Sequence, residues 1–186
     1  MQMFPKDRPP ETVFLLRHWV LCEIISLSKG VSIMAREIEE KYLITSDSWR
    51  PLVDETTTIS QTYLIGTRTI TIRTRIESNR PAVLCIKLAE RADGTPEYEW
   101  PIPRWVARIC SRLHSRSLSK HRHRIAWEGL TIEVDEFLGR LAGLIVAEVE
   151  LPTYDHQYTK PDWFGSNVTT DTRYKNARLV KNGLPT

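Results

Sequence analysis

The amino-acid sequence predicts an α+β fold in which an antiparallel β-sheet closes into a barrel, with helices packed outside and charged side chains inside. Seven short β-like segments carry a charged residue at every second position. Residues i, i+2 and i+4 of a strand lie on one face, so each segment has one charged face and one apolar face. The charges are also sorted by sign, acidic beside acidic and basic beside basic. Such sorting costs like-charge repulsion unless a ligand or metal ion of opposite charge lies between the side chains.

The alternative is an open antiparallel sheet whose apolar face packs on helices and whose charged face is solvated. Solvated faces usually mix Lys, Glu, Thr, Ser and Gln, whereas here like-charged pairs recur at i and i+2. This composition favours the barrel, in which the charged side chains line the lumen.

The expected strands follow one another along the chain, and each places charged residues opposite apolar ones. In the first of them, the charged face lies opposite Ile38, Tyr42 and Ile44. The charged residues, in order, are Glu37, Glu39 and Lys41 in residues 37–44, Arg73 and Arg75 in 70–76, Lys87 in 82–89, Glu97 and Glu99 in 96–102, Lys120 and Arg122 in 119–125 with Arg124 in phase, Glu133 and Asp135 in 131–137, and Glu148 and Glu150 in 145–151.

Two helices are expected between or after these strands. Pro103 opens a stretch from Arg104 to about Ser115, in which Trp105, Ile109 and Leu113 recur at i, i+4 and i+8. This spacing predicts a helix that packs these three residues on the barrel wall. A second short helix is expected over residues 155–158. The remaining large aromatic residues, Trp49, Trp127 and Trp163, are expected in the core or at the rim.

The charged faces together predict a metal-dependent site for a phosphate chain. They hold eight carboxylates and six basic groups, a formal charge of −2 that would repel a free polyanion. One or two divalent cations reverse that balance. Carboxylate oxygens without a cluster of His or Cys select hard ions such as Mg²⁺ or Mn²⁺. Arg binds phosphate oxygens in bidentate fashion and Lys binds them as a point charge.

An ordered series of motifs also resembles a known family. The motifs are Glu37-x-Glu39-x-Lys41, Gln61-Thr62-Tyr63-Leu64, Arg73-Thr74-Arg75, Lys87, Glu97-Tyr98-Glu99, Lys120-His121-Arg122, Glu133-Val134-Asp135-Glu136-Phe137, Ala147-Glu148-Val149-Glu150-Leu151, Trp163-Phe164-Gly165, and Val168-Thr169 with Arg173-Tyr174-Lys175-Asn176. From Met34 to about Pro185 the chain resembles the CYTH superfamily, the triphosphate tunnel metalloenzymes, and in particular its short single-domain bacterial members. The resemblance implies an eight-stranded antiparallel tunnel that hydrolyses or cyclises triphosphates with Mg²⁺ or Mn²⁺. It also implies that the chain from Trp163 onward folds back to close one mouth.

The resemblance assigns roles to individual residues. Lys41, Arg73, Arg75, Lys87 and Arg122 would hold the phosphate chain, with Lys120 beside the reacting end, and Lys41 and Lys120 would be the catalytic residues. The metal ligands, direct or through water, would be Glu37, Glu39, Glu97, Glu99, Glu133, Asp135, Glu148 and Glu150. One departure concerns Asn167, which stands where similar bacterial members usually carry a Glu. Its carbonyl can coordinate a metal but brings no charge, which weakens a second metal site.

The expected reaction is phosphoryl transfer to water, with inorganic tripolyphosphate cleaved to pyrophosphate and phosphate. The alternatives are a class IV adenylyl cyclase, a thiamine triphosphatase, and a non-catalytic sensor that binds polyphosphate or a nucleotide. Positioning and charge neutralisation would supply most of the rate. Lys120, with its pKa lowered by neighbouring cations, is one candidate for the proton acceptor.

The remaining features exclude other classes of protein. A net charge of +3 over 186 residues is too mild to indicate nucleic-acid binding, and three cysteines without metal spacing fit a reducing cytosol. His121 and His123 lack a third ligand for zinc. We expect a cytoplasmic monomer or homodimer that acts on a small-molecule triphosphate, with no membrane partner.

The first 33 residues differ from the rest of the chain. Residues 12–27 are apolar, but Arg17, His18 and Glu23 interrupt them, so neither a membrane span nor a cleavable signal is expected. We expect residues 1–33 to be an extension produced by a mis-assigned or disordered start, with Met34 as the natural first residue. Residues 34–186 would then form one domain.

Overall fold

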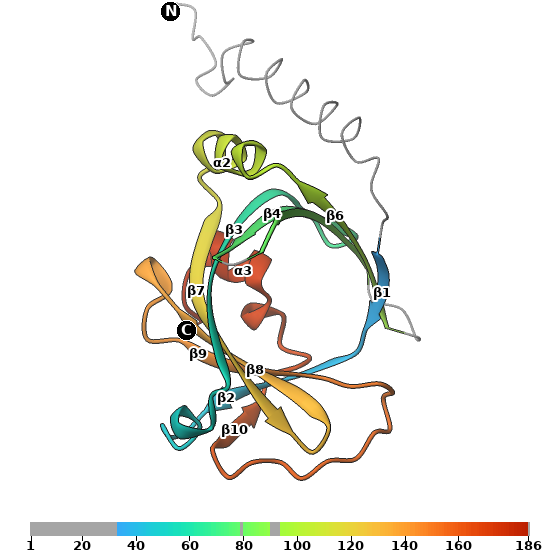
Figure 1. The fold of residues 1–186 in the computed structure, drawn as a ribbon, viewed down its shortest axis with the longest axis vertical. Helices are drawn as coiled ribbons and strands as arrows, with labels where there is room; N and C mark the ends of the chain where they lie inside the picture. Colours follow the sequence, from blue (N-terminus) through green and yellow to red (C-terminus); the bar gives the residue numbers. More distant parts are fainter. Residues whose placement is uncertain (1–32, 79, 90–93, 186) are drawn as a thin grey trace, which may run out of the picture.

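The structure is a computed structural model that describes residues 33–78, 80–89 and 94–185. The expectations for the N-terminal extension lie outside the described residues. Six of the seven predicted charged segments each correspond to one strand, and the segment 37–44 is divided between two strands at Ile38. All the strands belong to one antiparallel sheet (Figure 1). The strands are β1 (Ile33–Glu37), β2 (Glu39–Ile44), β3 (Glu55–Gly66), β4 (Ile70–Glu77), β5 (Ala82–Leu88), β6 (Thr95–Ile102), β7 (Ser117–Trp127), β8 (Leu130–Phe137), β9 (Ile145–Glu150) and β10 (Phe164–Asn167).

The prediction of eight strands closed into a barrel is wrong. The described sheet has ten strands in the order β1-β6-β5-β4-β3-β7-β8-β9-β2-β10, or nine if β1 and β2 are counted as one strand interrupted at Ile38. Its outermost strands, β1 and β10, do not pair with each other within the described residues. The physical reason is a change of partner at Ile38: before it the chain pairs with β6, and after it with β9. The sheet therefore curls round on itself without being closed as a barrel (Figure 1).

Two apolar clusters pack on the outer face of the curled sheet. The first contains Val134 and Val149 from β8 and β9, and it buries Trp49 and Trp163 at 0% and 3% exposure. Trp127 packs against the same cluster and donates through Nε1 to the carbonyl of Thr159 at 2.7 Å. The alternation of charged and apolar residues thus produces an outer core and an inner polar face.

The second outer cluster lies beneath helix α2 (Arg104–Leu113), which ends two residues before the predicted end. Ile109 packs on the sheet as predicted, but the prediction for Trp105 is wrong because its exposed fraction is 53%. The buried residues of the helix are Val106, Ala107 and Cys110. Because Val106 and Ala107 both face the sheet, the buried face of the helix is centred away from Trp105.

A third apolar cluster lies on the inner face, at one end of the hollow. Helix α3 (Asn176–Asn182) inserts Leu179 and Val180 there. They pack with Leu118 and Phe137, which share strand faces with Lys120 and Asp135 and therefore point inward. The end of the chain thus covers one end of the hollow, which agrees with the expectation for residues after Trp163.

The other short elements are three 3₁₀ helices. They are η1 (Arg50–Leu52), η2 (Gly139–Leu141) and η3 (Thr172–Tyr174). The predicted helix at residues 155–158 is wrong, because a turn ends at Asp155 and the residues after it have no regular secondary structure. Four residues are too few to nucleate a helix without strong support. Instead, the hydroxyl of Tyr158 donates to Glu40 at 2.8 Å. Neither of the described α-helices is long and apolar enough to span a membrane.

Candidate functional site

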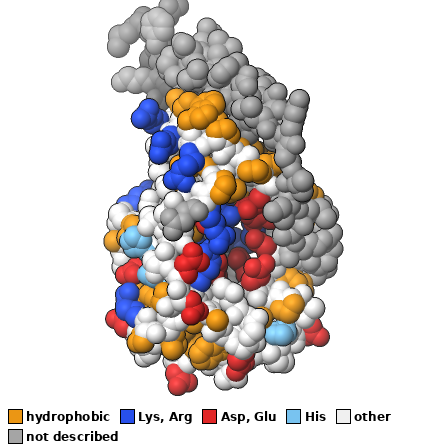
Figure 2. Space-filling model, in the orientation of Figure 1, with side chains coloured by type: hydrophobic (Ala, Val, Ile, Leu, Met, Phe, Trp, Pro, Cys, Tyr) orange, Lys and Arg blue, Asp and Glu red, His pale blue; other side chains and the backbone are white. Residues whose placement is uncertain are grey.

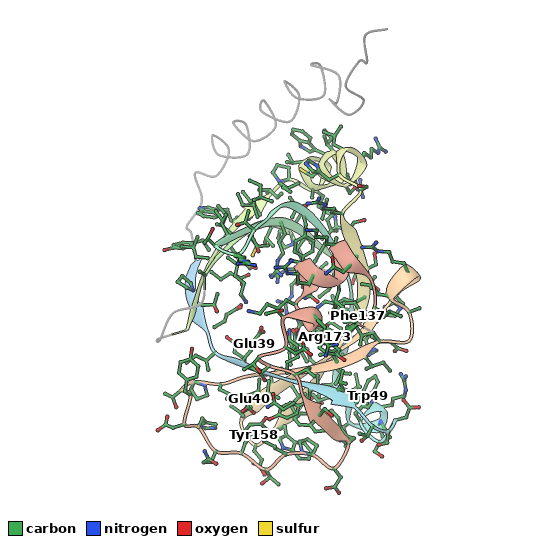
Figure 3. The ribbon with its side chains drawn as sticks, turned by 180° about the vertical axis from the view of Figure 1, so that it is seen from behind. Glu39, Glu40, Trp49, Phe137, Tyr158 and Arg173 are labelled. Carbon is green, nitrogen blue, oxygen red and sulfur yellow. The ribbon has the colours of Figure 1, made fainter. Side chains whose placement is uncertain are left out.

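Basic and acidic side chains gather around a hollow on the face of the molecule drawn in Figure 2. A cavity of about 240 Å³ opens there, and six carboxylates and four guanidinium groups line it. The strand alternation is visible in β2, which sends Glu39 into the hollow and Glu40 away from it, toward Tyr158 (Figure 3). The lining residues are Glu37, Arg75, Glu77, Arg80, Glu97, Glu99, Arg122, Arg124, Glu133 and Glu150.

One wall of the site is organised around Glu97, and we call its five residues the Glu97 cluster: Glu37, Arg73, Cys85, Lys87 and Glu97. The Arg73 guanidinium lies 3.2 Å from Glu97 Oε1, and the Cys85 thiol donates to the same oxygen at 2.7 Å. Lys87 Nζ lies 2.6 Å from Glu37 Oε2 and 3.5 Å from Glu97 Oε2. Adjacent strands β4, β5 and β6 and the edge strand β1 bring these residues together because all five occupy inward positions.

The electrostatics of this cluster separate its two carboxyl groups. Burial and the charge of Glu97 raise the pKa of Glu37 to about 7, against the opposing effect of Lys87. Burial alone would raise the pKa of Glu97 as well, but Arg73 and Lys87 lower it to about 2. Burial raises the pKa of the Cys85 thiol to about 12. The cluster therefore holds one firmly ionised carboxylate, one carboxyl group that exchanges its proton near neutrality, and a neutral thiol.

The opposite wall is organised around Asp135, and we call its five residues the Asp135 cluster: Lys41, Lys120, Arg122, Asp135 and Glu148. Arg122 donates to both oxygens of Asp135 at 2.8 Å and to Glu148 at 2.8 Å. Lys41 Nζ lies 2.6 Å from Glu148, directly across from it in the β2–β9 pairing. Lys120 is fully buried and donates to Asp135.

Burial and the neighbouring Arg122 lower the pKa of Lys120, against the attraction of Asp135 and Glu148. Glu148 shows the reverse balance. Burial alone would raise its pKa, but Lys41, Lys120 and Arg122 hold it well below the usual range. Lys120 is thus the cation of this wall whose charge is least stabilised by its surroundings.

Five predicted residues belong to neither cluster. Arg75 pairs with Glu99 at 2.8 Å, and Glu133 pairs with Arg122. Glu39 lies 3.7 Å from Lys41. Within the part of the chain that the structure describes, Glu150 makes no ion pair with another residue, and burial and the charges of Glu133 and Glu39 raise its pKa.

Sequence reasoning missed several inward residues. Glu77 lies 3.2 Å from Arg75 Nε and continues the alternation of Arg73 and Arg75 by one step, so a strand extended past residue 76 would have included it. Arg124, which is in phase with Lys120 and Arg122, pairs with Glu133 at 3.1 Å and with Glu55 at 3.2 Å. Two further residues are Arg80, which lines the cavity, and Gln61, which is buried beside Tyr63.

Two other predicted features lie away from the cavity. His121 and His123 are on the outer side of β7, where they hydrogen-bond to Thr58 and Thr56, and they belong to no three-ligand metal group among the described residues. Asn167 is exposed on β10, and its Oδ1 accepts a hydrogen bond from the amide of Thr169 at 3.0 Å. Its role as a metal ligand stays a prediction.

The donor set of the cavity fits a hard divalent cation. It consists mainly of carboxylate oxygens, which Mg²⁺ and Mn²⁺ prefer. Oε2 of Glu97 and Oε2 of Glu77 are buried and accept no hydrogen bond from the described residues. Three ligand atoms, from Cys85, Glu97 and Glu99, lie within 4.8 Å of one another.

Comparisons with known proteins give one consistent family. The family model described as the CYTH domain matches residues 35–182. An inorganic triphosphatase of Acetivibrio thermocellus is 36% identical over 151 residues, which cover 80% of this chain and 96% of the relative. An inorganic triphosphatase of Nitrosomonas europaea is 42% identical over 55 residues, which are 28% of this chain and 36% of that relative. The crystal structure of an inorganic triphosphatase superposes with a TM-score of 0.60 at 28% identity, covering 81% of this chain and 98% of the other.

Proposed function

Because this chain belongs to the CYTH domain family, we propose that it is a metal-dependent phosphoanhydride hydrolase, an inorganic triphosphatase that cleaves tripolyphosphate to pyrophosphate and phosphate. The similarity to inorganic triphosphatases over nearly their whole length supports this choice of substrate. The cytoplasmic location and the monomeric or homodimeric state expected from the sequence stay predictions.

The observation that carries the proposal is the pairing of charges inside the hollow. Each of the six proposed phosphate-binding cations makes an ion pair with a proposed metal-binding carboxylate. The pairs are Lys41–Glu148, Arg73–Glu97, Arg75–Glu99, Lys87–Glu37, Lys120–Asp135 and Arg122–Asp135. For a fully buried pair such as Lys120–Asp135, removing one partner costs several kcal/mol, about 3–5, because the other charge is left uncompensated.

A triphosphate that carries a chelated divalent cation replaces both partners at once. Its phosphate oxygens offer acceptors to the Lys and Arg side chains, and its metal ion offers positive charge to the carboxylates. We propose as metal ligands, direct or through water, Glu37, Glu39, Glu97, Glu99, Glu133, Asp135, Glu148 and Glu150. When bound, Mg²⁺ or Mn²⁺ would neutralise phosphate charge and polarise the phosphoryl oxygens.

The protein's own residues would act by positioning. Arg73, Arg75 and Arg122 offer planar donor pairs to phosphate oxygens, whereas Lys41 and Lys87 act as point charges. Held from both walls, the phosphate chain would lie extended, with its terminal phosphorus open to in-line attack by water. We propose Lys120 beside this end, because its lowered pKa suits it to exchange a proton when ligand binding withdraws Asp135.

A substrate comparison tests the proposal. Purified protein is incubated with Mg²⁺ or Mn²⁺ and, separately, with tripolyphosphate, ATP or thiamine triphosphate. Phosphate release is expected to be fastest from tripolyphosphate. Cyclic AMP formed faster than phosphate is released from tripolyphosphate would indicate an adenylyl cyclase, and preference for thiamine triphosphate would indicate that substrate instead. Tight binding of tripolyphosphate without turnover would indicate a sensor.

Two variants connect the activity to the site. Lys41→Ala and Arg73→Ala are each expected to lower kcat/KM for tripolyphosphate by about 100-fold or more, since each removes a charged donor from a largely water-excluded site. Arg50→Ala is the matched control, because Arg50 lies outside the cavity and pairs with Asp47 and Glu136. Equal activities of Arg73→Ala and Arg50→Ala would contradict the assignment.

A further inference from the structure

Cys85 is a thiol placed among charged groups. Its side chain is fully buried, yet its Sγ contacts the carboxylate of Glu97 at 2.7 Å and stands in the same wall as Arg73 and Lys87. Cys110, the other described cysteine, packs instead in the apolar cluster beneath α2. A structural cysteine has no need of a carboxylate partner, so the position of Cys85 calls for a chemical explanation.

Cys85 completes a set of three donors of two kinds. It lies directly across from Glu99 in the β5–β6 pairing, and Glu97 is the next inward residue of β6. The sulfur atom and one carboxylate oxygen from each glutamate lie within 4.8 Å of one another. Both strands are paired on both sides, so the backbone holds this spacing in place.

A second observation indicates that the group has room for a ligand. Glu97 is 3% exposed, and its Oε2 is buried without a hydrogen-bond partner among the described residues, although Lys87 Nζ forms an ion pair with it at 3.5 Å. Burying an ionised carboxylate oxygen that accepts no hydrogen bond costs free energy unless a cation lies beside it. Glu97 and Glu99 also line the cavity, which gives an ion from solvent a path to them.

The sulfur changes which ion this group prefers. Carboxylates alone favour Mg²⁺, Mn²⁺ or Ca²⁺, whereas a thiolate favours softer ions such as Zn²⁺ and Cd²⁺. We propose that Cys85, Glu97 and Glu99 form a binding site for a thiophilic divalent cation, with Zn²⁺ as its natural occupant. On binding, the metal–sulfur bond replaces the S–H bond, and the proton leaves to solvent. The ion also takes the carboxylate of Glu97 from Arg73.

This site gives the protein a means of inhibition. Glu97 and Glu99 are among the carboxylates proposed to hold the metal of the triphosphate, so Zn²⁺ bound through Cys85 removes them from turnover. Only this consequence rests on the proposed function. The binding of the cation itself does not.

Cadmium binding tests the site directly. Cd²⁺ is titrated into the full-length protein, and the cadmium–thiolate charge-transfer absorption is followed in the ultraviolet. The wild type is expected to bind one ion with this absorption. Cys85→Ser is expected to lose the absorption and to bind Cd²⁺ at least about tenfold more weakly, since one of three ligands has lost its preference for the ion. Cys110→Ser and Cys22→Ser are the matched controls and are expected to keep both.

Other outcomes are equally decisive. If Cys85→Ser keeps the affinity and the absorption of the wild type, the site is overturned. If Cys85→Ser does not fold, cadmium NMR of the wild type decides, because a sulfur ligand shifts the resonance far from the range of all-oxygen sites. An all-oxygen resonance overturns the site.

Inhibition is measured separately from binding. With Mg²⁺ present, the Zn²⁺ concentration that halves phosphate release is expected to be about tenfold higher for Cys85→Ser than for Cys110→Ser. If Cd²⁺ binds as expected but no triphosphate is hydrolysed with any metal ion, the proposed function fails and the site stands. If both variants are inhibited at the same Zn²⁺ concentration, the inhibitory role fails.

Discussion

At the scale of single residues, position on the inner face decides how each carboxyl group behaves. Glu37 and Glu97 are the same residue type and share Lys87, yet the pKa of Glu37 is raised to about 7 and that of Glu97 is lowered to about 2. Glu97 has Arg73 and the Cys85 thiol as additional donors, whereas Glu37 faces the charge of Glu97. Pairs of carboxyl groups whose pKa values are driven apart are typical of sites that must hold cations or exchange protons.

The raised pKa of Glu37 predicts a pH-dependent stability. Because its pKa is about 7 in the folded chain and 4.5 in the unfolded chain, the folded state binds the proton more tightly. The stabilising contribution of Glu37 is therefore complete below about pH 4.5 and is lost as the pH rises through about 7. In metal-free protein, the unfolding free energy of wild type relative to Glu37→Gln is expected to fall between about pH 5 and about pH 8. Urea unfolding at each pH measures it.

The control for this measurement is Asp171→Asn. Asp171 is a carboxylate outside the cavity whose pKa is lowered by hydrogen bonds from the side chain and the amide of Arg173. Its contribution is lost only as the pH falls below the range measured, so the difference between wild type and Asp171→Asn should stay level. A wild-type advantage over Glu37→Gln that grows with pH would contradict the assignment of Glu37.

At the scale of elements, hydrogen bonds along both edges of β2 position Lys41 in the site. This strand pairs with β9 on one side and with β10 on the other. The amide of Val168 donates to the carbonyl of Lys41 at 2.8 Å, and the amide of Lys41 donates to the Thr169 hydroxyl at 2.9 Å. The segment that follows β10 thus fixes the backbone of a residue proposed to bind phosphate.

Gly165 allows β10 to approach β2. A Cβ at this position would lie 2.8 Å from Cγ2 of Thr45 and 3.2 Å from the carbonyl oxygen of Leu43. Neither neighbour yields easily, since one is a stiff β-branched side chain and the other is backbone. Gly165→Ala is expected to lower the unfolding free energy by about 1–3 kcal/mol, as overpacking does. Gly66→Ala is the matched control, because nothing lies within 4 Å of a Cβ there. Urea unfolding of both variants should separate them, and equal losses would contradict this account.

At the scale of the whole molecule, the sequence predicted which faces meet but not how the sheet ends. Alternating charge marks an inward face wherever the residues are Glu, Asp, Lys or Arg, which is why all seven charged segments lie in strands. Strand β3 lacked this mark, because its inward residues Thr57 and Gln61 are neutral. The alternation of charged and apolar residues does not reveal the change of pairing partner at Ile38, because the residues before and after Ile38 follow the same alternation. The number of strands and the open edge of the sheet could therefore not be predicted from the alternation of residues.

The same limit applies to the candidate site. Residue types and alternation predicted fourteen charged positions, and the structure brings thirteen of them into ion pairs with one another. Glu77 was missed because the expected strand ended one residue before it. Arg124 was missed as a site residue because only the first two basic residues of its strand face, Lys120 and Arg122, were assigned to the site. The Cys85–Glu97 contact depends on register between β5 and β6, which spacing along one strand cannot show.

The paired charges predict that metal ion and triphosphate bind cooperatively. A phosphate chain that binds alone must separate Arg73 from Glu97 and Lys41 from Glu148, which leaves the buried carboxylates without a counter-charge. A metal ion that binds alone takes the carboxylates instead, which leaves Arg73 and Lys41 without a counter-charge. When the metal ion and the phosphate chain bind together, the carboxylates pair with the metal ion and the basic side chains pair with the phosphate oxygens, so every charge keeps a counter-charge. Mg²⁺ is therefore expected to raise the affinity for a methylene-bridged, non-hydrolysable triphosphate by about tenfold or more, and the analogue should raise the affinity for Mg²⁺ by the same factor. Calorimetric titrations in both orders, corrected for the complex that Mg²⁺ and the analogue form in solution, measure the two factors.

Two variants connect this coupling to the ion pairs. Lys87→Met should reduce the coupling, because Glu37 then has no cation to exchange, whereas Arg50→Met, outside the cavity, should leave it unchanged. Equal affinity for the analogue with and without Mg²⁺ would show that the ion pairs of the hollow are not the partners being exchanged.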